Sequence, residues 1–166
     1  YFMVFTDGPA GTLGAVEQTA DPEAWMLEMD VQDAGDLPAL ATTLIHEIAH
    51  VFTLNTSQVV TDLAVFNDPE DDAAYAEGDA TCEPYFMFEG CSTPDSYINQ
   101  FFARYWGELY PGWLEINQEQ DETTLENLLS DFYGRHPGQF VSSYAATSPE
   151  EDIAESFLYF VLSPPP

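Results

Sequence analysis

The pentapeptide His46-Glu47-Ile48-Ala49-His50 constrains the fold of this chain more than any other segment. It lies inside the apolar run 44–52, which predicts a helix packed into the protein. Residues four apart lie on one face of a helix, so the two imidazoles can bind one metal ion. Glu47 stands beside them, where its carboxylate can accept a proton from a metal-bound water. Because a partly exposed polar helix face can carry the same pattern, the rest of the chain has to supply the remaining site.

A catalytic zinc site needs a third protein ligand and keeps one open position. The metzincin pattern HExxHxxGxxH requires glycine and histidine at two positions that Thr53 and Thr56 occupy here, so that class is excluded. One further histidine, His136, lies between glycine and proline residues and is expected in a loop, from which it would approach the cleft only as a hydrogen-bond donor. The third ligand is therefore sought among the carboxylates.

A second helix is predicted after Ser148, and it offers suitable carboxylates. Pro149 suits a first helical turn, and the acids behind it favour the positively polarised end of a helix. Glu151 and Glu155 lie one turn apart, so one can bind metal while the other accepts the distal N–H of a ligating histidine. Glu150 is the alternative ligand if the register differs by one residue; otherwise Glu150 and Asp152 are expected to be solvated. The apolar residues that follow at helical spacing are Ile153, Phe157, Leu158 and Phe160 or Val161.

The HEIAH and EDIAESF segments together resemble the gluzincins, zinc peptidases whose third ligand is a glutamate. The likeness is strongest to the minigluzincins and to the anthrax lethal factor catalytic domain, and it covers residues 25–162. Tyr144 stands seven residues before Glu151, where this family has a tyrosine that stabilises the oxyanion of the transition state. The resemblance implies zinc ligands His46, His50 and Glu151, Glu47 as the general base, and Glu155 as the acid that contacts a ligand histidine.

The resemblance also implies a zincin-like α+β fold for residues 1–166 as a single domain. A small mixed sheet and the active-site helix would lie above a mainly helical lower half, with 164–166 as the start of a proline-rich tail or linker. The strand predicted by the alternation in 24–31 would be the sheet edge that pairs with extended substrate, although an ordinary core-facing strand has the same alternation. Zincins of this type usually have a backing helix before the first strand, and this sequence shows none.

The remaining elements are predicted from helix-capping and turn residues and from the periodicity of apolar residues. Residues 1–6 predict a buried strand, and Asp36 with Leu37-Pro38 predicts a helix that runs to about Thr53. The acidic stretch 67–79 predicts a solvated loop, with a calcium site as the less favoured reading. Turns are expected at Gly8, Pro9, Gly11 and Gly14, core packing at Tyr97, Phe101 and Tyr105, and a short amphipathic helix over 125–133.

The charge balance restricts the partners of this protein. Two Lys+Arg stand against thirty Asp+Glu, which gives a net charge of −28. Such a surface repels nucleic acid and anionic membranes. Two explanations of this negative charge remain open: adaptation to high salt, and selection of cationic substrates near an acidic cleft. Because the carboxylates are spread along the chain rather than gathered in blocks, we favour adaptation to high salt.

Cys82 and Cys91 are the only cysteines, and their close spacing predicts a disulfide and an exported protein rather than a zinc site. No apolar run reaches the eighteen or so residues that span a bilayer. Tyr1 leads directly into an apolar run without a basic segment, so a mature form or an excised domain is expected. The proline tail would fit attachment to a cell surface through a longer parent chain.

The sequence therefore predicts an exported, monomeric zinc metallopeptidase acting on peptides or proteins, in which a metal-activated water attacks the peptide bond and Glu47 is the general base. The competing class is a non-catalytic, zinc-containing acidic binding module of a larger protein. An intact Glu47 argues against it, since a structural site needs no general base. An aspzincin with Asp131 as the ligand is weaker, because the Gly-Thr that precedes that aspartate in the pattern is missing.

Overall fold

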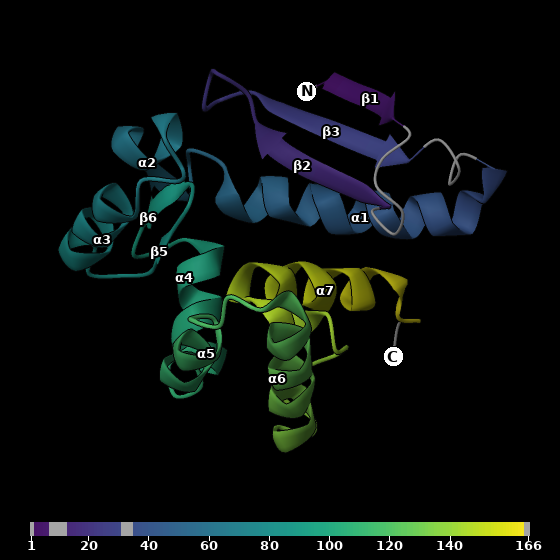
Figure 1. The fold of residues 1–166 in the computed structure, drawn as a ribbon. Coiled ribbons are helices and arrows are strands. Elements are labelled where there is room, and N and C mark those ends of the chain that lie inside the picture. The colour runs from purple at the N-terminus through teal and green to yellow at the C-terminus, as the bar shows by residue number, and fades with distance from the viewer. Residues whose placement is uncertain (1, 7–12, 31–34, 165–166) are drawn as a thin grey trace.

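The computed structural model of this chain describes residues 2–6, 13–30 and 35–164. These residues form a mixed α+β structure with a three-stranded sheet, a second small sheet and a mainly helical C-terminal half. Figure 1 shows the first sheet on one side of the long helix α1 (Leu37–Leu54) and helix α7 (Pro149–Leu162) on the other. The α+β class is as predicted. The turns expected at Gly8, Pro9 and Gly11 lie outside the described residues.

The first sheet has the order β1-β3-β2, with β1 at Phe2–Thr6, β3 at Trp25–Asp30 and β2 at Gly14–Gln18. Strand β3 pairs in parallel with β1 and antiparallel with β2, so it is the central strand. The prediction that 24–31 forms the edge strand beside the cleft is therefore wrong, because that place belongs to β2. A five-residue strand that begins with Gly14 has too little alternation to be recognised, and the glycine indicated a turn instead.

Helix α1 begins and ends close to the predicted positions. The Asp36 side chain accepts a hydrogen bond from the Ala39 amide at 3.1 Å, and the Asn55 side chain donates to the Val51 carbonyl at 2.8 Å. The helix packs against β2 on one side and α7 on the other. By length and composition alone it is apolar enough to cross a membrane, which the sequence did not lead us to expect. Its packing between the sheet and α7 accounts for that apolar character.

Helix α7 begins at Pro149, as predicted, with the Ser148 hydroxyl accepting a hydrogen bond from the Glu151 amide at 3.1 Å. The buried face that packs on α1 includes Ala154, Glu155 and Leu158. The predicted apolar face is only partly correct, because Phe160 is 79% exposed. The small residue Ala154 allows α1 and α7 to approach closely, and this brings their polar side chains into contact.

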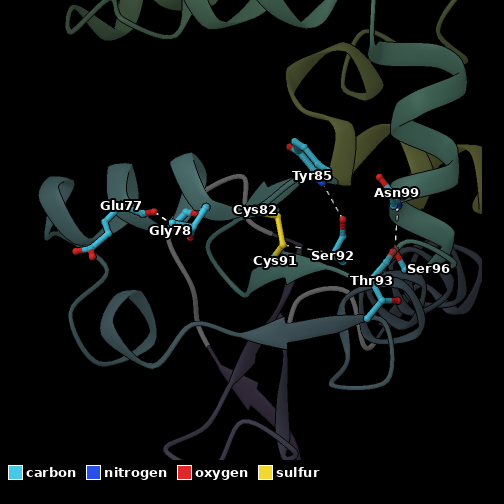
Figure 2. The surroundings of a disulfide bond; sticks show 10 residues. Glu77, Gly78, Cys82, Tyr85, Cys91, Ser92, Thr93, Ser96 and Asn99 are labelled. Carbon is cyan, nitrogen blue, oxygen red and sulfur yellow. Dashed lines mark hydrogen bonds between the residues drawn. A yellow bond between two sulfur atoms is a disulfide. The ribbon is translucent and has the colours of Figure 1, made fainter.

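A second sheet, with the order β4-β6-β5, lies beside two short helices. Its strands are β4 (Val59–Thr61), β5 (Phe86–Met87) and β6 (Gly90–Ser92), and the helices are α2 (Leu63–Asn67) and α3 (Asp72–Thr81). The predicted disulfide between Cys82 and Cys91 is present and joins the end of α3 to β6, with the two Cα atoms 5.6 Å apart (Figure 2). It therefore ties the hairpin β5–β6 to its neighbouring helix.

The acidic stretch 67–79 is not a loop, because its second half belongs to α3. The Asp71 carboxylate accepts hydrogen bonds from the amides of Ala73 and Ala74 and so starts the helix. Gly78 is a packing residue within α3: the ring of Phe86 occupies the space that a side chain there would fill. The carboxylates of α3 are exposed to solvent, so that half of the prediction is correct.

The lower half in Figure 1 is helical, as predicted. It contains α4 (Tyr97–Phe101), a π-helical stretch Phe102–Trp106, α5 (Tyr110–Ile116), α6 (Glu122–Arg135) and a 3-10 turn Ala145–Thr147. The helix predicted over 125–133 lies within α6.

The aromatic face predicted for the core of this half is wrong for two of its three residues, since Phe101 does pack against the core. Tyr97 is 65% exposed and Tyr105 is 46% exposed, whereas Ile98 and Trp106 are fully buried. Each buried residue follows an exposed aromatic one directly, and aromatic residues stand at both sets of helical positions. Periodicity alone therefore could not decide which face of the helix is buried.

Candidate metal centre

Helix α1 presents both histidines of the HEIAH segment, with the intervening glutamate, at a buried position. His46, Glu47 and His50 are each less than one-tenth exposed. The ring centroids of the two histidines lie 4.9 Å apart at an interplanar angle of 75°, which brings their Nε2 atoms within 3.1 Å of each other. Two imidazole nitrogens thus converge on one point, as the four-residue spacing predicts.

Helix α7 adds a carboxylate to this point from the other side of the cleft. The Glu151 Oε2 atom lies 3.0 Å from His46 Nε2 and 3.5 Å from His50 Nε2. Among the residues that the structure describes, His46, His50 and Glu151 form the group of side chains that are placed to hold a metal ion. His46 and Glu151, which are 105 positions apart in the sequence, are brought together by the packing of α7 on α1.

The protonation equilibria indicate a site that favours positive charge. Burial raises the pKa of Glu151, but hydrogen bonds from His46 and His50 outweigh it and hold that pKa at about 2. Burial lowers the pKa of His46, but the hydrogen bond and charge of Glu151 outweigh it, so the net shift is upward. The ionised Glu151 carboxylate therefore stabilises positive charge at this point, either that of an imidazolium or that of a metal cation.

The geometry of the three donor atoms fits a single small cation. Ligands that lie 2.0–2.1 Å from a tetrahedral zinc ion are separated from one another by about 3.3 Å. The three separations here, 3.0, 3.1 and 3.5 Å, are close to that value. Two imidazole nitrogens and one carboxylate oxygen are also a donor set that suits zinc and other divalent transition metals.

Glu155 holds one of the two imidazoles in place. Its Oε1 atom accepts a hydrogen bond from His46 Nδ1 at 3.0 Å, so Nε2, on the Glu151 side of the ring, is the nitrogen that can bind a metal ion. The other carboxylate oxygen accepts a bond from the Ser142 hydroxyl at 2.6 Å, and Ser142 in turn accepts one from the Ala145 amide at 3.0 Å. A chain of hydrogen bonds therefore fixes the tautomer and orientation of His46.

Glu47 lies beside the three converging atoms and faces the open side of the site. It lines both cavities that flank the centre, and its carboxylate has a backbone hydrogen bond with Val16 of strand β2. Burial raises its pKa above the ordinary value, although the nearby His50 and His46 oppose that shift. The carboxylate is therefore a stronger base than a solvated glutamate.

Tyr144 lies at the mouth of the site. Its ring centroid is 5.7 Å from that of His46, its side chain is half exposed, and it lines both flanking cavities. Desolvation of the phenol raises its pKa, and the charge of Glu151 adds to the effect. The hydroxyl therefore stays protonated at neutral pH, so it is available as a hydrogen-bond donor.

Three other candidate residues have different partners. His136 packs its ring against Phe132, 4.7 Å away, and lines a separate cavity between α5 and α6. Glu150 is partly buried, and its Oε1 atom accepts a hydrogen bond from the hydroxyl of Tyr85 at 2.7 Å, so it is only in part the solvated residue that was expected.

The prediction for Asp152 is wrong. This residue is 3% exposed and accepts a hydrogen bond from Trp106 Nε1 at 2.9 Å. Burial raises its pKa to about 6. The run of three acids suggested a solvated helix end, but the first turn of α7 directs each side chain into a different buried environment.

Two contributors to the site were missed in the sequence. Ser142 sits in a short polar segment whose composition indicates only a loop, and its role depends on contacts with α7. The strand β2 was read as a turn, although Gly14 lines both flanking cavities. Both residues lie outside the two motifs of the site, so no local pattern indicated their part in it.

Comparison of this chain with protein-family models, with curated proteins and with solved structures finds no match.

Proposed function

We propose that this protein is a zinc-dependent peptidase with a zincin-like active site. The convergence of His46, His50 and Glu151 in a cleft, with Glu47 on its open side, carries the proposal. A structural metal site does not require a buried glutamate that binds no metal, whereas a catalytic site needs one as a general base. The gluzincin resemblance of the two motifs assigns the same roles to the same residues.

Zinc bound by the three ligands would supply Lewis-acid chemistry, polarising a peptide carbonyl and making a water molecule acidic near neutral pH. Glu47 takes the proton of the attacking water. Its raised pKa suits this task, since a base works best when its pKa lies near the working pH. The protonated Glu47 then delivers the proton to the nitrogen of the leaving amine.

Tyr144 and Glu155 assist from opposite sides. The Tyr144 hydroxyl donates a hydrogen bond to the carbonyl oxygen as negative charge develops on it in the transition state. Glu155 keeps the proton on Nδ1 of His46, so that Nε2 remains a ligand throughout the reaction. The Ser142 hydroxyl limits the freedom of Glu155, and the ligand geometry is thereby maintained.

The exposed edge of β2 is the surface on which the substrate backbone would bind. Its other edge is occupied by β3, and the Gly14–Val16 part of β2 lines the cavity that contains Glu47. An extended peptide that pairs with this edge would pass directly over the metal centre. Strand pairing fixes the backbone, which leaves specificity to the flanking cavities.

The Cys82–Cys91 disulfide supports export of the protein to an oxidising compartment, because such bonds are rare in reducing ones. The high negative charge excludes nucleic acid as a substrate. We therefore place the activity outside the cytoplasm, on peptides or proteins.

Hydrolysis of a mixed peptide library, followed by mass spectrometry, tests the proposed function. Replacing Glu47 with glutamine should lower the rate by about 10²- to 10⁴-fold, the usual contribution of a general base. Zinc content should stay the same in the variant, because Glu47 is not a ligand. If the wild-type protein binds zinc but cleaves no member of the library, the non-catalytic binding module becomes the better account.

A further inference from the structure

A cavity of about 690 Å³ opens beside the metal centre, next to the C-terminal half of α1. Glu47, His50 and Glu151 line one end of it, so it is continuous with the site. A smaller cavity of about 400 Å³ lies on the other side of His46 and is lined by Thr43 and Leu158. The larger cavity has the size of a ligand-binding pocket.

Aromatic rings form much of the wall of the larger cavity. Tyr110 stacks on Trp113 with ring centroids 5.4 Å apart, and Tyr75 lies 5.1 Å from Phe88. Tyr85 stacks on Phe102, with ring centroids 4.1 Å apart. Rings fixed in this way offer apolar surface to an aliphatic chain, and their faces attract cations.

Two carboxylates that are not part of the ligand set also line this cavity, Glu89 and Glu150. Tyr85 donates a hydrogen bond to Glu150, but a neutral hydroxyl does not cancel the charge of the carboxylate. Glu89 is partly buried, and desolvation raises its pKa to about 7, with the charge of Glu150 adding to the effect. Among the described residues neither carboxylate forms an ion pair with a basic side chain, and the charge of His50, which lowers the pKa of Glu89, does not offset the effect of burial.

Neither arginine of the protein pairs with these carboxylates. The chain has no lysine, and Arg104 and Arg135, its only arginines, do not line the cavity, whereas the metal ligand His50 does. The Arg104 guanidinium lies over the ring of Tyr105 at 5.4 Å, and Arg135 donates a hydrogen bond to the carbonyl of Asp131. A cationic group of a bound molecule would supply a charge that the two arginines do not.

A second polar group in the same wall lacks a partner. Trp25 is 2% exposed and lines the cavity, and its Nε1–H is the one buried side-chain nitrogen or oxygen, among the described residues, without a hydrogen bond. Buried indole N–H groups usually have an acceptor. The indole N–H of Trp25 is therefore a second polar group at this cavity whose hydrogen-bonding capacity is not used.

The turn that carries Glu89 is held in a fixed position. Gly90 has φ +129°, a conformation that favours glycine, and the backbone of Val60 leaves no space for a side chain there. Cys91 is bound to Cys82, and Figure 2 shows this disulfide beside the hydrogen bond from the Tyr85 amide to the hydroxyl of Ser92. The carboxylate is therefore held in place before a ligand binds.

We propose that this cavity binds a lysine or arginine side chain of the peptide substrate. The aliphatic part of the side chain lies along the aromatic wall, and its charged end reaches Glu89 and Glu150. These two residue types combine a long apolar stem with a terminal cation, as the cavity requires. The inference rests on the proposed function, because peptide binding along the cleft brings the side chain to the cavity.

Binding of blocked peptides that differ at one central residue tests this inference. Lysine and arginine peptides are compared with their uncharged counterparts, norleucine and citrulline, by calorimetry in high salt, where non-specific attraction is screened. The zinc-loaded Glu47→Gln protein is used, so that no peptide is cleaved. We expect the charged peptides to bind at least about tenfold more tightly, because the cation meets both carboxylates and aromatic faces.

Glutamine variants identify the source of the preference. Glu89→Gln, and separately Glu150→Gln, should reduce the tenfold ratio to below about threefold, since each removes one partner of the cation. Glu126→Gln, an equal change of charge at an exposed position of α6, should leave it unchanged. Circular dichroism and zinc content establish that each variant is folded.

Equal dissociation constants for lysine and norleucine peptides would overturn the inference, as would a preference that survives both cavity variants. Hydrolysis of the same peptides by the unsubstituted protein separates the two proposals. Cleavage without a preference for basic residues refutes the cavity assignment alone. A tenfold binding preference without any cleavage supports the cavity and refutes the peptidase.

Discussion

Replacing Glu89 with glutamine measures how much the partly buried carboxylate in the large cavity costs the folded protein. The pKa of Glu89 is about 7 in the folded protein, against 4.5 for a fully solvated glutamate, because burial disfavours the charged form. At 1.36 kcal/mol per pH unit, this gap corresponds to a loss of about 3 kcal/mol once the group is ionised. Since Glu89 is only partly buried, we expect about 1–3 kcal/mol in practice.

The sign of the effect follows from the raised pKa. Stability contributed by the protonated carboxyl is fully present below pH 4.5 and is lost as the pH rises through about 7. Glutamine does not titrate, so Glu89→Gln should raise the free energy of unfolding by about 1–3 kcal/mol at pH 8 and change it little at pH 4.5.

Urea denaturation of both proteins at these two pH values, in the same high salt, gives the difference directly. Removing any negative charge reduces repulsion in a chain of net charge −28, so Glu126→Gln provides the baseline. A gain at pH 8 no larger than that of Glu126→Gln would refute the reasoning. An equal gain at both pH values would also refute it, because the effect would then not depend on ionisation of Glu89.

Three further outcomes are expected. Glu155→Gln should weaken zinc binding by about 10- to 100-fold in a chelator competition, because His46 loses the carboxylate that orients it; unchanged affinity would contradict the role of Glu155. Replacing Cys82 and Cys91 with alanine should lower stability by about 2–3 kcal/mol, since the bond closes a loop with a sequence separation of 9, and an equal urea midpoint would refute this. The melting temperature should rise from low to molar salt as self-repulsion is screened; a flat profile would count against adaptation to high salt.

The helices that carry the metal centre could be predicted from the sequence, because their signals are local. Asp36 and Ser148 precede the helices as caps, and each helix has proline in its first turn. The four-residue spacings within them fix which side chains share a face. These local rules apply to α1 and α7 without knowledge of the rest of the fold.

The prediction was wrong where the outcome depends on packing between distant segments. Strand β2 has little pattern of its own and is defined by its pairing with β3. A glycine within a helix is unfavourable by local rules, and the reason for Gly78 is visible only in the fold, where the ring of Phe86 occupies the place of a side chain. Asp152 looks solvated because the partner that buries it, Trp106, lies 46 residues away. Contacts of this kind are not contained in any single stretch of sequence.

The large cavity belongs to the same category. Its wall combines residues from α1, α3, the β5–β6 turn and α5, and no motif links them in the sequence. The distribution of charges along the sequence favours a general adaptation to salt. Only the fold shows that Glu89 and Glu150 line the same cavity, which neither arginine of the protein lines.

The zinc content of the purified protein, compared with that of Glu151→Ala after dialysis, tests the central claim most directly. We predict one zinc per chain in the wild type and less than about one-tenth of that in the variant, because a carboxylate from α7 completes the site. The neighbouring variant Glu150→Ala should keep its zinc. Equal zinc in wild type and Glu151→Ala, or no zinc in either, would contradict the account.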